Sequence, residues 1–250
     1  MRTFHNIVDG KPGQASDGRT LDIHDPKTGE GYATSPLSGP ADVDAAYQSA
    51  QRAFRDGWAD TTPSDRVNGL LALAAAVEEH GPELVELEAQ NTGKPVGLTL
   101  SEEIGPMVDQ LRFFAGAARH LEGRATAEYM EGHSSSIRRE PLGVIGSVAP
   151  WNYPMMMAVW KIGPPLAAGN TLVLKPSDTT PASTVRLGEL AADVLPPGVL
   201  NVVCGDRSTG AAMTDHDIPA MVAITGSVAA GKAVAAAAAP RVKRVHLELG

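Results

Sequence analysis

Polar residues suited to binding and catalysis follow directly after short apolar runs in this sequence. Such groups stand at residues 149–152, 175–178 and 225–227, and a fifth run ends with Glu248. The runs are rich in β-branched residues and are separated by helical patterns, as in a parallel sheet. Because such sheets bind ligands at the carboxyl ends of their strands, the four groups predict one composite site.

Segment 225–227 is suited to a phosphate group. Gly226 lets the backbone approach a ligand closely, and a helix that begins at Ser227 directs free N–H groups and its dipole towards an anion. The segment lacks a GxGxxG pattern, however, and Ser227 is also an ordinary helix N-cap residue. The tripeptide alone leaves a phosphate contact and a plain cap as alternatives.

A lysine and a carboxylate follow the second apolar run. Lys175 and Asp178 are suited to hydrogen bonds with ribose hydroxyls, and a carboxylate at that place repels a 2′-phosphate, which favours NAD over NADP. A solvated pair of charges in a loop is the alternative for these two residues.

Two further residues are suited to catalysis. Asn152 lies in a crowded turn after Pro150 and Trp151, where a fixed side-chain amide can donate to an oxyanion. Glu248 ends an apolar run, where partial desolvation raises the pKa of a carboxyl group and suits it to general-base catalysis. A structural turn amide and a paired carboxylate are the alternatives.

The single cysteine is not interpreted as a nucleophile. Cys204 lies in the apolar run of residues 202–204, with no histidine or lysine close in the sequence to lower its pKa, so we expect a small buried side chain. One cysteine also excludes an intrachain disulfide, which fits a reducing cytoplasm. The histidines lack metal-ligand spacing, so no metal site is expected.

Composition is that of an ordinary globular protein. The chain has 250 residues, of which 43% are hydrophobic, and a formal net charge of -8. The acidic balance argues against binding to nucleic acid or to an anionic membrane surface. The sequence has no signal-peptide core and no apolar run of the ~20 residues that span a bilayer, so we expect a cytoplasmic location.

The order of elements predicts an α/β fold. Residues 1–40 predict short strands and turns, and helical spacing follows, with a third helix over residues 101–121. From residue 141 onward, five strands alternate with helices, which predicts a Rossmann-like parallel sheet with helices on both faces. The polar segment 134–140 has no apolar face of its own and predicts a projecting β arm.

Three segments follow from this order. Residues 1–132 are expected to form the N-terminal helical part of a nucleotide-binding domain. Residues 133–140 form the arm strand, and residues 141–250 form the Rossmann-like core.

These features together resemble the aldehyde dehydrogenase superfamily. The segments PLGVIGSVAPWNYP, LAAGNTLVLKPSD, LPPGVLNVVCG, AITGS and LELG stand in that family's order and spacing, and nearly the whole chain matches. The aminobutyraldehyde and betaine-aldehyde dehydrogenases are the most similar branch. The resemblance implies that the chain is the NAD-binding half of an enzyme that oxidises an aldehyde to a carboxylic acid.

The resemblance also implies roles for single residues. Asn152 is expected to donate to the oxyanion, and Glu248 is expected to activate the water that cleaves a thioester. Asp178 stands where the family usually has Glu, and the shorter side chain leaves the choice between NAD and NADP more open. The implied cofactor contacts are Ala149, Pro150, Trp151, Lys175, Ser177, Asp178, Gly210, Gly226, Ser227 and Val228.

The resemblance places the family's nucleophilic cysteine beyond Glu248, in a catalytic domain that we expect to be absent from this sequence. We therefore expect a chain that supplies the cofactor site, the oxyanion donor and the base, but is inactive alone. The arm is implied to support a homo-oligomer by pairing with a strand that is also absent. A non-catalytic dinucleotide-binding fragment and an assembly partner of another chain are the alternatives.

The substrate hypothesis rests on three residues. Tyr153 and Trp160 match positions that line the family's aldehyde tunnel, and two aromatic faces can hold a cationic amine. Asp109 is expected to add a carboxylate near the same entrance. Together these residues predict an aminoaldehyde such as 4-aminobutyraldehyde.

Overall fold

The computed structural model describes residues 1–250 and centres on a sheet of seven strands in the order β12-β11-β8-β9-β10-β2-β3. The first five strands are parallel and correspond to the five apolar runs, so the predicted sheet is confirmed. The core strands are β8 (Val144–Val148), β9 (Thr171–Lys175), β10 (Leu200–Val202), β11 (Met221–Gly226) and β12 (Arg244–Leu249).

N-terminal strands extend this sheet and form a second, smaller one. β2 (Asn6–Val8) and β3 (Lys11–Gly13) continue the main sheet beyond β10 in antiparallel pairing. The small sheet has the order β1-β5-β4. The expected short strands at the start of the chain are therefore confirmed, and the small sheet consists of β1 (Arg2–Thr3), β4 (Thr20–His24) and β5 (Gly31–Pro36).

The chain changes sides within the sheet between β10 and β11. β8, β9 and β10 follow one another in one direction, whereas β11 returns to pair with the other side of β8. The register places Met221 beside Ile145 and Ile224 beside Val148. The carboxyl ends of β8 and β11 therefore meet at a switch point, which is where open α/β sheets form a ligand crevice.

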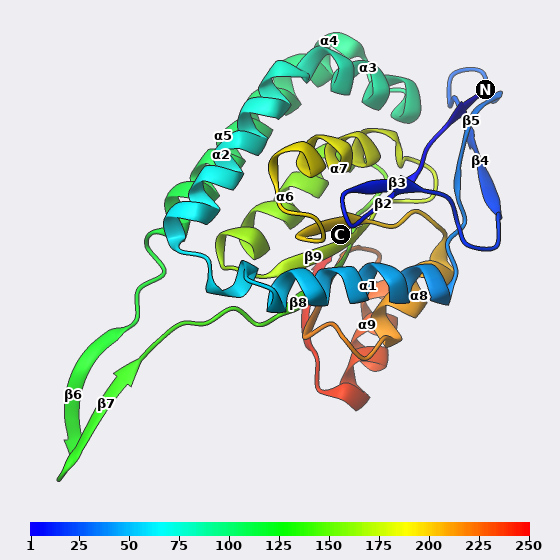
Figure 1. Cartoon of the computed structure of the whole chain (residues 1–250). Coiled ribbons are helices and arrows are strands. Elements are labelled where there is room, and N and C mark those ends of the chain that lie inside the picture. Colours follow the sequence, from blue (N-terminus) through cyan, green and yellow to red (C-terminus); the bar gives the residue numbers. More distant parts are fainter.

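Helices cover both faces of the sheet (Figure 1). Along β9, Leu172 and Leu174 belong to the core cluster of one face, and Val173 belongs to the cluster of the other face. None of the helices has both the length and the apolar character needed to cross a membrane. The first face carries α6 (Pro154–Ala167) and α7 (Ala182–Val194), and the second carries α1 (Pro40–Arg55), α8 (Arg207–Asp215) and α9 (Val228–Ala238).

An outer helical layer lies over α6 and α7 (Figure 1). Trp58 ties this layer to the sheet, since its Nε1 donates to the Asn170 carbonyl at 2.9 Å. The predicted third helix was wrong in its bounds, because the helical segment begins directly after Pro95 and contains a π-helical turn at Leu100–Ile104. The layer consists of α2 (Pro63–Glu79), α3 (Gly81–Thr92), α4 (Val96–Thr99) and α5 (Gly105–Ala118).

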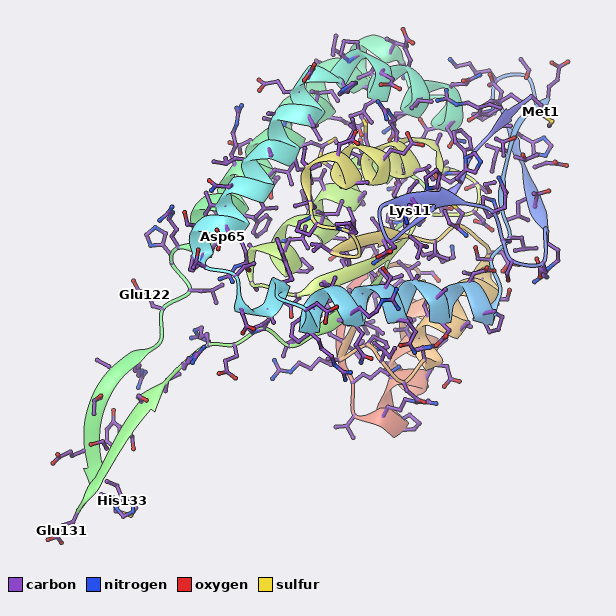
Figure 2. The ribbon with its side chains drawn as sticks, in the orientation of Figure 1. Met1, Lys11, Asp65, Glu122, Glu131 and His133 are labelled. Atoms are coloured by element: carbon purple, nitrogen blue, oxygen red, sulfur yellow. The ribbon has the colours of Figure 1, made fainter.

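The predicted arm is a hairpin that projects from the body of the domain. Figure 2 shows Glu131 and His133 at its tip, far from the packed core. β6 (Arg124–Met130) pairs antiparallel with β7 (His133–Ile137). The prediction of a lone strand over residues 134–140 was therefore incomplete. Its partner is the segment just before it, and the last three residues of that range lie outside the strand.

Gly146, in the middle of β8, sets how closely α1 packs on the sheet. A Cβ atom added there would stand 2.2 Å from the hydroxyl of the fully buried Tyr47, which donates to the Met213 carbonyl at 3.1 Å. We predict that Gly146→Ala lowers the free energy of unfolding by about 2–3 kcal/mol, because the tyrosine must move and lose this bond. Urea unfolding measures the change.

Gly116→Ala in α5 is the matched control. Its added Cβ meets no atom within 4 Å, so stability should stay the same or rise by up to ~1 kcal/mol. An equal loss of stability in both variants would contradict the packing account of Gly146.

Candidate active site

Two pockets lie on opposite faces of the sheet, beside the same ends of β8 and β11. The α9 pocket, among β8, β11, α8 and α9, has a volume of about 720 Å³. The α6 pocket, between α6 and the other face of β8, β11 and β12, has a volume of about 640 Å³. Val148 lines the first and its neighbour Ser147 lines the second. A ligand that passes over the end of β8 therefore reaches both pockets.

Lys175, at the end of β9, brings an ammonium group to the α9 pocket. The residue is 4% exposed, and its Nζ donates to the Pro176 carbonyl at 2.8 Å. Burial lowers the pKa of Lys175, and the nearby carboxylates of Asp178 and Asp206 oppose that shift. An ammonium group has three donors, so two remain for a ligand.

Ser227 and Gly210 also line the α9 pocket. Ser227 is the N-cap of α9, since its Oγ accepts from a first-turn N–H at 3.2 Å. The cap does not compete with a phosphate site, because the amides of Val228 and Ala229 have no acceptor within the helix. Gly226 and Val228 flank Ser227 without lining the pocket.

Ser177 and Asp178 are not brought into the lining of the α9 pocket. Ser177 Oγ donates to Asp178 Oδ1 at 3.2 Å, and the exposed Asp178 also accepts from the Thr179 N–H at 3.1 Å. The alternative of a solvated pair of charges does not hold for Lys175, which is buried. A cofactor contact of Ser177 or Asp178 stays a prediction. Asp206 and Arg207 line the pocket instead. Asp206 is the N-cap of α8, and an aspartate directly before a helical pattern could have indicated this from the sequence.

Residues 149–153 form the loop that follows β8. The buried Ala149 donates its N–H to the Lys175 carbonyl at 2.9 Å, and the Trp151 carbonyl accepts from Thr180 Oγ1 at 3.2 Å. These two bonds hold the loop against the β9–α7 connection. Ala149, Pro150 and Trp151 line neither pocket, and their contact with a cofactor stays a prediction.

Both residues that were expected to be catalytic lie in the α6 pocket. Asn152 and Glu248 both line it, together with Tyr153 and Trp160. The expected carboxylate of Asp109 near the entrance stays a prediction. That residue is exposed on α5 and is not part of the lining, since the opposite side of the helix is the one packed in the core.

Glu248 is exposed, which corrects the expectation of partial desolvation. β12 is the outermost strand of the sheet, and its one packed helix, α9, lies on the other face. The register pairs Glu248 with Thr225, whose side chain lines the same pocket. The carboxylate is therefore fixed by the strand and open to water.

Lys161 is the functional candidate that the sequence reasoning missed. It lies in α6, is 9% exposed and lines the α6 pocket. Burial lowers the pKa of Lys161 to about 8, and the Glu248 carboxylate opposes that shift. A lysine within an otherwise apolar helix was the available signal, because a buried ammonium group is costly unless it is used or paired.

Cys204 is buried and non-nucleophilic, as expected. It is 1% exposed, and burial raises the pKa of its thiol to about 12. The Lys175 ammonium group lowers that pKa in part, although the two residues are distant in sequence. No group of three His, Cys, Asp or Glu side chains is arranged to hold a metal ion.

Comparison with known proteins decides the family. The sequence profile of the aldehyde dehydrogenase family matches residues 14–250. The chain belongs to this family. Phenylacetaldehyde dehydrogenase of Pseudomonas fluorescens is 40% identical over 98% of the chain, and the match covers 50% of that protein.

Solved structures of aldehyde dehydrogenases share the fold. An enzyme from Bacillus cereus, solved as an NAD+ complex, has a TM-score of 0.96 and 36% identity over 100% of this chain and 51% of its own. A betaine aldehyde dehydrogenase from Staphylococcus aureus, in complex with NAD+, has a TM-score of 0.95 and 33% identity over the same shares, 100% and 51%. The chain spans about half the length of the relatives it matches.

We predict that Lys161 of this aldehyde dehydrogenase chain titrates near pH 8, far below an ordinary lysine. Glu248→Gln removes a negative charge that stabilises the ammonium form, so the pKa of Lys161 should fall further. NMR titration of the lysine side chain measures both values. Glu140→Gln, at an exposed carboxylate beyond the arm, is the control; a pKa unchanged or raised by Glu248→Gln would refute the coupling.

We also predict that Cys204 resists alkylation in this aldehyde dehydrogenase chain. Iodoacetamide at pH 8 should modify the native thiol at least ~100-fold more slowly than the thiol in urea-unfolded chain, because both burial and the raised pKa suppress the thiolate. Mass spectrometry follows the reaction. Comparable rates in the two states would mean that the thiol is accessible.

Proposed function

We propose that this chain binds NAD in the α9 pocket and takes part in the NAD-dependent oxidation of an aldehyde to a carboxylic acid. The observation that carries the proposal is the placement of two different pockets on opposite faces of the same strand ends, at the switch point. Lys175 and Ser227 line one pocket, and Asn152 and Glu248 line the other. A dinucleotide held in the first pocket can extend its reactive end over β8 towards the second.

The α9 pocket fits a dinucleotide in its shape and its donors. The side of α9 that lines it carries only alanine and valine below Ser227, which leaves room for a flat base. The Lys175 ammonium group and the free amides of the first turn of α9 suit ribose and phosphate oxygens. Two relatives, with TM-scores of 0.95 and 0.96, are solved with NAD+, and NAD supplies the hydride acceptor when it is bound.

Two side chains of the α6 pocket have different catalytic roles in this proposal. The Asn152 amide donates to the aldehyde oxygen, on which negative charge develops during attack at the carbonyl carbon. Glu248 is placed to accept a proton from water, and its exposure on β12 gives water access. Cys204 is excluded as the nucleophile by its burial, so the activity proposed is that of a complete enzyme with a different cysteine.

The aminoaldehyde substrate is a narrower hypothesis within this function. Tyr153 and Trp160 line the α6 pocket, as that hypothesis requires, but Asp109 does not. Aromatic walls suit an uncharged aldehyde equally well, and the relative that is 40% identical is named for phenylacetaldehyde.

Homo-oligomer formation is the partner proposal, and the β6–β7 arm supports it. Tyr129, Met130 and Ile137 are exposed on the hairpin, where they contribute nothing to the core. Exposed apolar side chains of this kind are typical of contacts with another chain.

Calorimetric titration tests the cofactor proposal on this chain directly. We predict saturable binding of NAD, and a loss of at least ~10-fold in affinity for Lys175→Met and for Ser227→Ala. Lys232→Met, an exposed lysine of α9 outside the pocket, is the matched control and should bind as the parent does. A folded chain without NAD affinity, or equal losses in the control, would overturn the proposal.

A further inference from the structure

Behind the α6 pocket lies a buried ionic cluster that the proposed function does not use. Lys94 contacts two carboxylates, Glu88 at 2.8 Å and Glu103. The glutamates are 0% and 1% exposed. Ser183 Oγ donates to the other oxygen of Glu88, which links α3 to α7. Such a cluster holds its side chains in place, because moving one partner away would leave a buried charge without compensation, which is strongly destabilising.

Neighbouring bonds make this corner of the fold rigid. Asn91 Nδ2 donates to the Thr179 carbonyl at 2.9 Å, and its Oδ1 accepts from the Ala182 N–H at 3.0 Å. Gly93 ends α3 with a left-handed φ of 78°. The position of the Lys94 ammonium group is therefore determined from both sides, by α3 and by the start of α7.

The same ammonium group lies over the ring of Tyr153. Nζ of Lys94 is 4.5 Å from the ring centroid, which is the geometry of a cation–π contact. Tyr153 lines the α6 pocket and Lys94 does not, so the lysine meets the ring from behind the pocket wall. The carboxylates are more deeply buried than Lys94, so the ring meets the positive side of the cluster.

We propose that Lys94 positions the ring of Tyr153 and sets the selectivity of the α6 pocket against aldehydes that carry a positive charge. This inference rests on the proposed function, because it concerns the substrate of that same site. A cation on the pocket side of the ring competes with Lys94 for the same π electrons, so its contact with the ring is weakened. An uncharged apolar group makes the same contact with the ring without this competition.

The rest of the pocket agrees with this selectivity. Glu248 is the one carboxylate in its lining, and the Lys161 ammonium group stands in the same lining. The remaining wall includes Met157, Leu142 and Met221, which suit an aromatic or branched aliphatic group. The chemistry of the pocket therefore favours an uncharged, apolar aldehyde over an aminoaldehyde.

Two probes of equal shape separate charge from size. Choline and 3,3-dimethylbutan-1-ol differ only in the replacement of nitrogen by carbon at the branched centre. Their affinities are measured on the whole chain by NMR of ¹³C-labelled tyrosine, with the Tyr153 signal assigned through Tyr153→Phe. No cofactor or turnover is needed, so failure here is distinct from failure of NAD binding.

The variant Lys94→Met/Glu103→Gln removes the ammonium group and one carboxylate together, which keeps the net charge of the cluster. It should raise the affinity for choline about two- to fivefold relative to the neutral alcohol. Lys94→Arg should keep the parent's ratio, and so should Lys27→Met, at an exposed lysine outside both pockets. An unchanged ratio in the folded double variant, or no effect of either probe on Tyr153, would overturn the proposal.

Tyr153→Leu provides a second test that leaves the buried cluster intact. Because this variant lacks the Tyr153 signal, both affinities are read from the ¹³C-methyl signal of Met157, which lines the same pocket. The ring is about half exposed, so its removal disturbs little of the core. Affinity for the neutral alcohol should fall while that for choline stays the same, because choline does not use the ring. An equal loss for both probes would show that the ring holds cations, contrary to the proposal.

Discussion

The pairing of β8 with β11 is the constraint on which both pockets depend. Side chains alternate along each strand, so this one pair supplies Ser147 and Thr225 to the α6 pocket and Val148 and Ile224 to the α9 pocket. A shift of one residue in the register would exchange the two walls and turn their side chains to the wrong faces. Backbone hydrogen bonds between β8 and β11 thus decide which side chains line each pocket.

The charged groups near these pockets differ in burial, and burial shifts the pKa of several of them. Lys175 and Lys161 are desolvated, which lowers the pKa of each ammonium group, and a nearby carboxylate limits the shift in both cases. Glu88 shows the converse effect, since burial raises its pKa and Lys94 opposes the change. Glu248 lies on the face of β12 that α9 does not cover, and it stays open to water. The fold therefore determines which of these groups can exchange protons at moderate pH.

Residues whose role depends on local pattern were predictable from the sequence. The five parallel strands, the cap at Ser227 and the burial of Cys204 follow from apolar periodicity and short-range chemistry. Features that depend on contacts between residues distant in the sequence could not be predicted from it. The exposure of Asp109, the partner strand of the arm and the role of Lys161 each require knowledge of which element covers which. Lys94 belongs to the second kind, because its carboxylate partners lie on separate helical segments.

The β6–β7 hairpin shares almost no core with the remainder of the chain, since of its two strands only Ala127 is even half-buried. Substitutions there leave the packing of the sheet and its helices untouched. The arm can therefore change its surface chemistry over evolution without a folding penalty, whereas the strands beneath the pockets cannot. A protein built in this way can acquire new neighbours while its reaction chemistry stays fixed.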